Sequence, residues 1–485
     1  MPLFNCADDW TLPVISNVCE VLEEIATKEL KYSLYPNQLE IVDFEGMINN
    51  NTLIGMPFLY GHWSFGKSFI QDQKQYLAGR SNLAYEMVLN TNPCINHLLD
   101  NNDMVEMCLV VAHSACGHNG FFKNNYMFKT FTQADAIVNY LKFAKYYIKK
   151  CEDKYGEIVV ESWLDSCHAL QNYGIDMYLR RTKTKEEMDE DAIFLKINQQ
   201  KVIDYDLLWE YTIPKIEKSV EDAAAKDLGR LDKPEENILY FIEKNAKWLP
   251  VWKREIIRIV RKLAQYFYPQ GKSKISNEGF ATFTHYELIN RLYNKKHIDD
   301  GTYMQFLRMH SNVITQPEYS KKYYSGINPY TLGFNIYRDI KRICENPTDE
   351  DLKALPHLKG VHWIDAIQEA MKNYIDPSFI SQFLSPKVIR DMKLFAISDV
   401  TDDDYVTVTE IQDDEGYDKI RQRLSLQYER NWRIPNIQIV AANLNDSRTL
   451  TLEYNPYNGR KLDPESLEAV MQHIENLWGF DIEFS

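Results

Sequence analysis

The spacing of apolar residues changes near residue 392, and this change divides the chain into two kinds of structure. Before it, apolar residues recur every three or four positions in segments such as 14–34 and 103–180, as is typical of amphipathic helices. After it, short runs such as YVTVTEI and TLTLEYN alternate β-branched and polar residues between turn clusters, as is typical of hairpin strands. The chain is therefore predicted to contain a mainly α-helical region, 1–391, and a small α+β domain, 392–485, with the element order ββαββαβ.

A charged segment interrupts the helical region. Residues 183–235 are rich in Lys, Glu and Asp, so we expect a surface excursion or hinge there and not a part of the core. Helical spacing resumes after it, in segments such as REIIRIVRKLAQYFY and ATFTHYELINRLY.

Charge and composition exclude several classes of protein. The 485 residues include 55 Lys and Arg and 70 Asp and Glu, and the formal net charge of −15 offers no general attraction to nucleic acid or anionic lipid. The start, MPLFNCADDW, lacks the basic and apolar parts of a secretory signal, and apolar runs such as CLVVA are far shorter than the ~20 residues of a membrane span. We expect a cytoplasmic protein. Its eight Cys include no CxxC pair, which disfavours a zinc finger and a disulfide framework.

Histidines are the best guide to a site, because eight of the 11 lie between residues 62 and 310. His113 and His118, in VVAHSACGHNG, are five residues apart, a spacing that turns ~140° on a regular α-helix. Both can reach one metal ion only if the helix ends or bulges between them, and Gly117 is a candidate for that position. The alternative is that His113 is a core histidine at the end of an apolar helix.

Three helical segments place a carboxylate seven residues before a histidine, about two turns away on one face. These pairs are Glu106 and His113, Glu161 and His168, and Glu278 and His285. Asp165 adds an Asp-x-x-His sequence related to the Glu-x-x-His of di-metal helical bundles. Such carboxylates either bind a metal or accept a hydrogen bond from the imidazole nitrogen that faces away from the metal, which fixes the tautomer of the ring. For the segment around Asp165, the alternative is a solvated acidic face beside one capped histidine.

Several longer strings carry a family resemblance. They include YPNQLEIVDFEGM, LAYEMVLNTNPCINHL, AHSACGHNGFFKNN, ESWLDSCHAL, SNEGFATFTHY and GINPYTLGFNIYRDIKRICENPTDED. Together with the ending LWGFDIEF, these strings resemble the stage V sporulation protein R (SpoVR) family over nearly the whole chain. The resemblance implies a role in spore cortex formation and sporulation, or in a stress response in bacteria that do not sporulate. It also implies two partners that tend to be encoded nearby, a PrkA-like serine protein kinase and a von Willebrand A type protein.

The string SNEGFA is also similar to a segment of the gluzincin aminopeptidases, in which the glutamate is the third zinc ligand. That resemblance implies a zincin-like metal site formed by His113, His118 and Glu278, with a fourth position open for water. His285 would be an additional ligand or a general acid. Zinc is the metal that we expect first, with iron or manganese as the alternatives.

The HExxH sequence that supplies the general base of zincins is absent. Glu106, Glu161 or Asp165 would therefore have to activate the water, with His168 as a general acid or a further ligand. These residues predict a metal-dependent hydrolase that acts on a peptide, or on a peptidoglycan fragment, as the family's connection with the spore cortex implies.

Two other hypotheses stay open. The first is a dinuclear iron or manganese bundle built from Glu106, His113, Asp165, His168 and Glu278. The second is a non-enzymatic adaptor or scaffold in the kinase pathway, in which the histidines pack in a helical core and the α+β tail docks a partner. Measurement of bound metal separates the enzyme from the adaptor.

Overall fold

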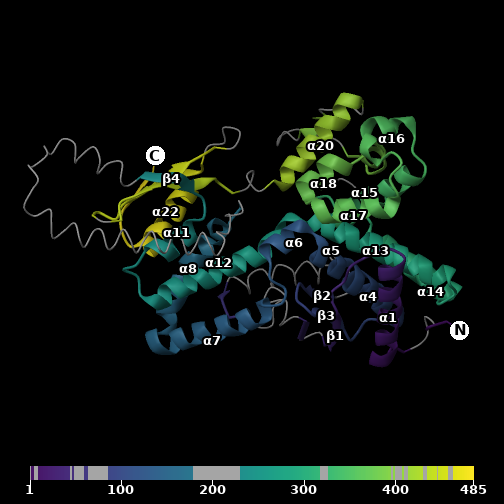
Figure 1. The fold of residues 1–485 in the computed structure, drawn as a ribbon, viewed down its shortest axis with the longest axis horizontal. Coiled ribbons are helices and arrows are strands. Elements are labelled where there is room, and N and C mark those ends of the chain that lie inside the picture. Colours follow the sequence, from purple (N-terminus) through teal and green to yellow (C-terminus); the bar gives the residue numbers. More distant parts are fainter. Residues whose placement is uncertain are drawn as a thin grey trace, which may run out of the picture. The chain divides into compact units, whose positions relative to one another are not determined.

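The computed structural model describes residues 2–4, 9–43, 46–47, 59–63, 86–177, 230–316, 326–394, 397–398, 407–408, 413–429, 434–444, 446–456 and 462–484 (Figure 1). The chain forms two compact units. Unit 1 comprises residues 1–161 and 266–433, and unit 2 comprises 162–265 and 434–485. Helices α8 (Glu157–Ala169) and α12 (Val251–Lys272) contain two of the points at which the chain passes from one unit to the other.

Unit 1 is mainly helical, as the sequence predicts. Its helices are α1 (Leu12–Lys28), α4 (Met104–Val111), η1 (Ala112–His118), α5 (Asn119–Asn124), α6 (Tyr126–Phe131), α7 (Ile137–Tyr155), α13 (Lys274–Asn294), α14 (Asp300–Val313), α15 (Pro329–Glu345), α16 (Asp349–Ala354), η3 (Pro356–Leu358), α17 (Trp363–Asn373), α18 (Asp376–Phe383), α19 (Pro386–Asp391) and α20 (Asp414–Tyr428). Helix α13 is buried along most of its length and packs against α15 and η1. It approaches α15 closely because Gly279 faces Gly333, and a Cβ atom at Gly279 would stand 2.3 Å from Gly333 Cα.

Unit 1 also contains a three-stranded sheet that the sequence analysis did not predict. Its strands are β1 (Asn37–Val42), β2 (Glu86–Leu89) and β3 (Cys94–Leu99), in the order β1-β3-β2. β3 pairs in parallel with β1 and antiparallel with β2. β3 is buried at five of its six positions, so its sequence shows no two-residue alternation that would mark it as a strand.

Unit 2 combines a sheet with helices. Its sheet contains β4 (Arg230–Glu235), β7 (Ile437–Ala442), β8 (Leu450–Tyr454) and β9 (Ile482–Phe484), in that order. Its helices include η2 (Gln171–Gly174), α11 (Ile238–Asn245) and α22 (Pro464–Trp478). The fully buried Trp478 accepts a hydrogen bond at its backbone oxygen from Trp248 Nε1, 2.9 Å away, which ties α22 to the segment before α12.

The C-terminal elements follow the predicted order ββαββαβ, but they are shared between the units. β5 (Ile397–Ser398) and β6 (Thr407–Val408) pair with each other, and α20 packs on α18 in unit 1 through an apolar face. β7, β8 and β9 belong to unit 2, where β4 adds an edge strand. The structure thus divides the chain at residue 434, whereas the sequence analysis placed the boundary at 392.

The sequence analysis assigned residues 183–235 to a charged surface excursion. The last part of that segment, Arg230–Glu235, forms strand β4. Residues 183–229 lie outside the described residues. Among the helices that the structure describes, none combines the length and the hydropathy that a bilayer span requires.

Candidate metal centre

A π-helix brings the first two candidate ligands together. Helix α4 continues without a break into η1, a π-helix that contains both His113 and His118. A π-helix pairs residue i with residue i+5, so two side chains five positions apart lie on the same side of it. The two imidazole rings are 4.7 Å apart between centroids. The bulge that the sequence analysis required is therefore present, and Gly117 lies within it.

The start of α13 supplies Glu278. The buried carboxylate of Asp376 accepts hydrogen bonds from the backbone nitrogens of Ile275, at 2.9 Å, and Ser276, at 2.8 Å. These bonds satisfy backbone donors that have no partner inside the helix, and they fix where its first turn lies. Glu278 Oε2 then stands 3.4 Å from His118 Nε2 and 3.6 Å from His113 Nε2.

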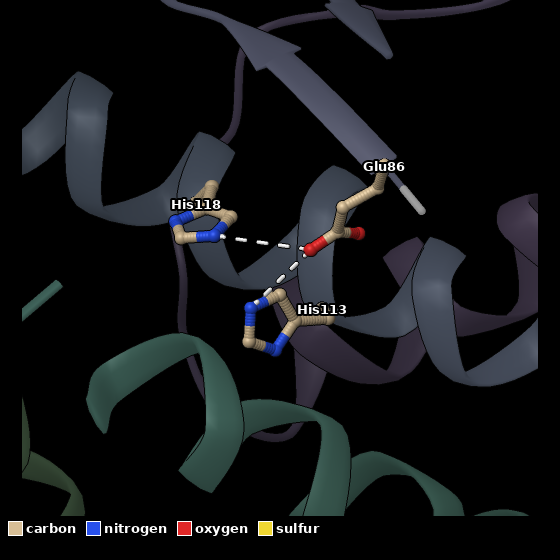
Figure 2. Close-up of side chains that lie close together, drawn as sticks. All are labelled: Glu86, His113 and His118. Carbon is tan, nitrogen blue, oxygen red and sulfur yellow. Dashed lines mark ion pairs between the residues drawn. The ribbon is translucent and has the colours of Figure 1, made fainter. Parts of the chain in front are cut away.

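A second carboxylate comes from the sheet. Glu86 is the first residue of β2, and its side chain extends between the two histidines (Figure 2). Its Oε1 atom lies 3.4 Å from His113 Nε2 and 4.0 Å from His118 Nε2. Glu86, His113, His118 and Glu278 are called the donor cluster below, and they are contributed by β2, η1 and α13.

The donor cluster fits a divalent transition metal. Among the described residues, His113 Nε2, Glu86 Oε2 and Glu278 Oε2 are buried atoms without a hydrogen-bond partner. Leaving such a group unpaired costs about 1–3 kcal/mol, which a bound cation would offset. Imidazole nitrogen and carboxylate oxygen are ligands of zinc and iron, and two ligands held tetrahedrally at about 2.0–2.1 Å stand about 3.4 Å apart. The donor separations of 3.4 and 3.6 Å around Glu278 agree with that spacing.

The tautomer of His118 is fixed by a hydrogen bond at Nδ1, the ring nitrogen that faces away from the donor cluster. Its Nδ1 atom lies 3.0 Å from Oδ1 of Asn277, the residue before Glu278. An amide oxygen only accepts hydrogen bonds, so Nδ1 carries a proton and Nε2 is the nitrogen that faces the donor cluster and can bind a metal once it is deprotonated. Phe122 stacks on the same ring, with centroids 5.8 Å apart, and limits its rotation.

The surroundings move the pKa values of the two carboxylates in opposite directions. Burial raises the pKa of Glu86 to about 8, an effect that His118 offsets only in part and that Glu278 reinforces. Burial alone would also raise the pKa of Glu278, but His118 and His113 outweigh it and hold that pKa well below its usual range. Glu278 is therefore ionised at neutral pH, whereas Glu86 can take up and release a proton there.

The two histidines of the donor cluster also differ. Burial lowers the pKa of His113 to about 4, so this ring is neutral at pH 7. Burial acts in the same direction on His118, but the carboxylates of Glu278 and Glu86 outweigh it and raise the pKa of His118 to about 9. In the metal-free protein, His118 therefore carries a proton that a metal ion must displace.

Tyr330 lies at the edge of the donor cluster. It stands in the first turn of α15, where the side chain of Asn328 caps the helix by accepting from Tyr330 N. Its ring stacks on His113 with centroids 6.1 Å apart, and its phenol lies near the carboxylates of Glu278 and Glu86. Burial and the neighbouring carboxylates raise the pKa of Tyr330 well above 10, so the hydroxyl remains a donor.

The other predicted catalytic residues lie elsewhere. Glu106 closes a capping box at the start of α4, where its carboxylate accepts from Asp103 N at 2.9 Å, and its predicted role in activating water stays a prediction. Glu161 is exposed on α8. Asp165 and His168 belong to unit 2, whereas the donor cluster belongs to unit 1. The catalytic roles of Glu161, Asp165 and His168, and the dinuclear site that included two of them, stay predictions.

His285, predicted as a further ligand, lies behind His113. Its Nδ1 atom contacts His113 Nδ1 at 3.1 Å, and its Nε2 atom contacts His310 Nδ1 at 2.8 Å. Both ring nitrogens are thus engaged away from the donor cluster. The sequence analysis missed Glu86, Tyr330 and His310, because spacing along one helix does not reveal residues that separate elements bring together. The one signal for Glu86 and Tyr330 was their place in the family strings LAYEM and GINPY.

Comparison with known proteins agrees with the resemblance seen in the sequence. The family described as SpoVR like protein matches residues 9–433, and the SpoVR-like C-terminal domain matches residues 435–485. The chain belongs to the SpoVR family. This SpoVR-family chain is 44% identical over 481 residues to "Uncharacterized protein YcgB" of Escherichia coli (strain K12), and the match covers 98% of this chain and 92% of that protein. No solved structure matches the chain. The whole donor cluster lies within the first family match.

Proposed function

We propose that this SpoVR-family chain is a metal-dependent hydrolase in which His113, His118 and Glu278 hold the metal and Glu86 is the general base. One observation carries the proposal: a carboxylate oxygen of Glu86 and one of Glu278 each lie within 4.0 Å of Nε2 of both His113 and His118, and two of these four atoms, His113 Nε2 and Glu278 Oε2, are buried without a hydrogen-bond partner. Three protein ligands leave a metal position open to water and substrate, as catalytic zinc sites require.

The opposite pKa shifts assign the two carboxylates. Glu278 is ionised over the whole neutral range and contacts both histidines, which suits a ligand. Glu86, with a pKa raised to about 8, can take a proton from water and return it near neutral pH, which suits a general base. Pairs of titratable groups whose surroundings separate their pKa values are typical of acid–base sites.

The reaction that follows is the addition of water to a carbonyl group. A divalent metal in this site supplies Lewis acidity and makes water a better nucleophile. Glu86 accepts the proton of the attacking water and then delivers it to the leaving nitrogen. The protonated phenol of Tyr330 donates a hydrogen bond to the carbonyl oxygen as negative charge develops there. His113 and His118, held by contacts on their Nδ1 sides, keep their Nε2 lone pairs directed at the site.

The proposed substrate is an amide bond in a peptide or a peptidoglycan fragment. This choice rests on the connection of the family name with sporulation and the spore cortex. The PrkA-like kinase and the von Willebrand A type protein remain the proposed partners, in a sporulation or stress-response pathway. Zinc is the first choice of metal, and iron or manganese is the alternative, because two histidines and one carboxylate also hold iron in oxygenases.

Mass-spectrometric metal analysis of the purified, tag-free protein tests the proposal. The wild type should carry one metal ion per chain and cleave peptide or peptidoglycan substrates. The double variant His113→Ala/His118→Ala should lose both properties and still unfold cooperatively. His297→Ala, which removes a histidine outside the donor cluster, is the matched control and should retain both. A wild type without metal after metal-replete expression would overturn the metal-dependent hydrolase and favour the adaptor. A double variant with undiminished cleavage would show that the donor cluster is not the source of the activity.

A further inference from the structure

Three buried imidazoles form a continuous row behind the donor cluster. His113 Nδ1 and His285 Nδ1 are 3.1 Å apart, and His285 Nε2 and His310 Nδ1 are 2.8 Å apart. The rings come from η1, α13 and α14, and their exposed fractions are 1%, 0% and 4%. Contacts between three separate elements require the three helices to be placed together, so the row is a built feature of unit 1.

The row can carry its protons in only one order when His113 Nε2 binds a metal. That nitrogen must then present its lone pair, so the proton of His113 is on Nδ1 and is donated to His285 Nδ1. His285 accepts there, so its own proton is on Nε2 and is donated to His310 Nδ1. Each ring thus fixes the tautomer of the ring before it.

Among the residues that the structure describes, those around His310 are mainly aromatic and give no other reason for an imidazole. The ring lies among Phe306, Phe334 and Tyr286, with centroids 5.8, 4.8 and 4.9 Å away. An apolar side chain would pack there without the cost of burying polar nitrogens. The polar contact that the structure gives this ring is the hydrogen bond to His285, so the acceptor at Nδ1 is the property that His310 supplies to the site.

We propose that His310 is a positioning residue for the metal centre, which acts through His285 to hold His113 in the tautomer whose Nε2 lone pair faces the donor cluster. This inference rests on the metal centre of the proposed function, but it requires no hydrolysis. His310 does for His113, through His285, what Asn277 does directly for His118, which is to fix the tautomer of the ring. Removing such supporting partners typically costs about 10–100-fold in metal affinity.

Zinc binding by the full-length protein tests the inference. Zn²⁺ is titrated into chelator-stripped protein against a competing chelator. His310→Leu removes the acceptor and should weaken Zn²⁺ affinity by about tenfold or more. His310→Asn places an amide oxygen near the former Nδ1 position and should restore the affinity to within about threefold of wild type. Phe306→Leu, which alters packing beside the same ring, should lower stability and leave the affinity unchanged. The visible spectrum of the Co²⁺-substituted protein should change in His310→Leu and return in His310→Asn.

The results separate this inference from the proposed hydrolase. Wild-type affinity in His310→Leu, equal losses in Phe306→Leu, or no recovery in His310→Asn would each overturn the positioning role. If the leucine variant does not fold, nitrogen-15 NMR of the zinc-loaded wild type decides. Protons on His113 Nδ1 and His285 Nε2 support the row, and a proton on His285 Nδ1 overturns it. A wild type that binds zinc tightly without hydrolysis overturns the hydrolase alone, whereas a wild type that binds no zinc overturns both.

Discussion

Gly117 of η1 lies so close to Ala281 of α13 that a Cβ atom at Gly117 would stand 2.6 Å from Ala281 Cα. The contact joins the π-helix that carries both histidines to the helix that carries Glu278. Any side chain at position 117 has to push these two backbones apart. The distance of 3.4 Å between His118 Nε2 and Glu278 Oε2 therefore depends on the absence of a side chain at Gly117.

Gly117→Ala should consequently damage both stability and metal binding. Overpacking a close helix contact typically costs about 1–3 kcal/mol, and the displaced helices should also weaken Zn²⁺ affinity. Gly271→Ala in α12 is the control, because a Cβ atom there meets nothing within 4 Å and alanine favours a helix. Thermal melts and chelator competition measure the two effects. An alanine at position 117 that leaves both unchanged would show that the two helices can separate without loss.

Glu278→Gln should weaken metal binding while the protein stays folded. Glutamine keeps the shape of the side chain but removes the charge that a ligand needs, so Zn²⁺ affinity should fall by well over tenfold. Glu106→Gln is the control, since glutamine also serves in a capping box and the structure places Glu106 at the start of α4. Affinities measured by chelator competition should therefore separate the two variants. Equal losses in both would contradict the assignment of Glu278 as the ligand.

Glu86→Gln should separate catalysis from metal binding. If Glu86 is the general base, the glutamine amide that replaces its carboxylate cannot accept a proton from water, and kcat/KM should fall by about 10²–10⁴-fold. The metal content should remain close to one ion per chain, because His113, His118 and Glu278 are unchanged. Hydrolysis assays and metal analysis on the same preparation give both numbers. Loss of the metal would instead make Glu86 a fourth ligand and would refute its role as the base.

The sequence predicted part of the donor cluster. The uneven distribution of the histidines pointed to His113 and His118, the resemblance of SNEGFA to a gluzincin segment added Glu278, and the structure brings these three together. Glu86 gave no such signal, since it starts a four-residue strand. It reaches the histidines through the antiparallel pairing of β2 with β3, in which Met87 opposes His97. Local periodicity does not contain that pairing.

The fold shows the same limit. The predicted order of C-terminal strands and helices is present, because each element is set by its own spacing of apolar residues. The division between the units was not predictable in this way. β4 comes from residues 230–235 and pairs with β7, about 200 residues later in the chain, at Arg230 opposite Ala441. A contact between such distant segments is decided by tertiary packing, and a charged sequence such as RLDKPE gives no sign of it.

Metal affinity should rise with pH because of His118. The pKa of His118 is raised to about 9 from an ordinary value of 6.5, so the ring is protonated at pH 7 in the metal-free protein. The protonated ring of His118 stabilises the folded, metal-free protein fully below pH 6.5, and this stabilisation is lost as the pH rises through about 9. A metal ligand must be neutral, so binding releases this proton, and the apparent Zn²⁺ affinity should increase about tenfold per pH unit up to pH 9.

The other histidine of the donor cluster leaves this pH window unaffected. His113, whose pKa is lowered to about 4, is already neutral above pH 6.5 and releases no proton there. Chelator-buffered Zn²⁺ titrations between pH 6.5 and 9 measure the dependence, and calorimetry in buffers of different ionisation enthalpy counts the protons. In Glu278→Gln the carboxylate that does most to raise the pKa of His118 is gone, so the dependence should flatten above the new, lower pKa. An affinity that does not change with pH in the wild type would show that His118 is neutral before the metal arrives, and the charge balance inferred for the donor cluster would be wrong.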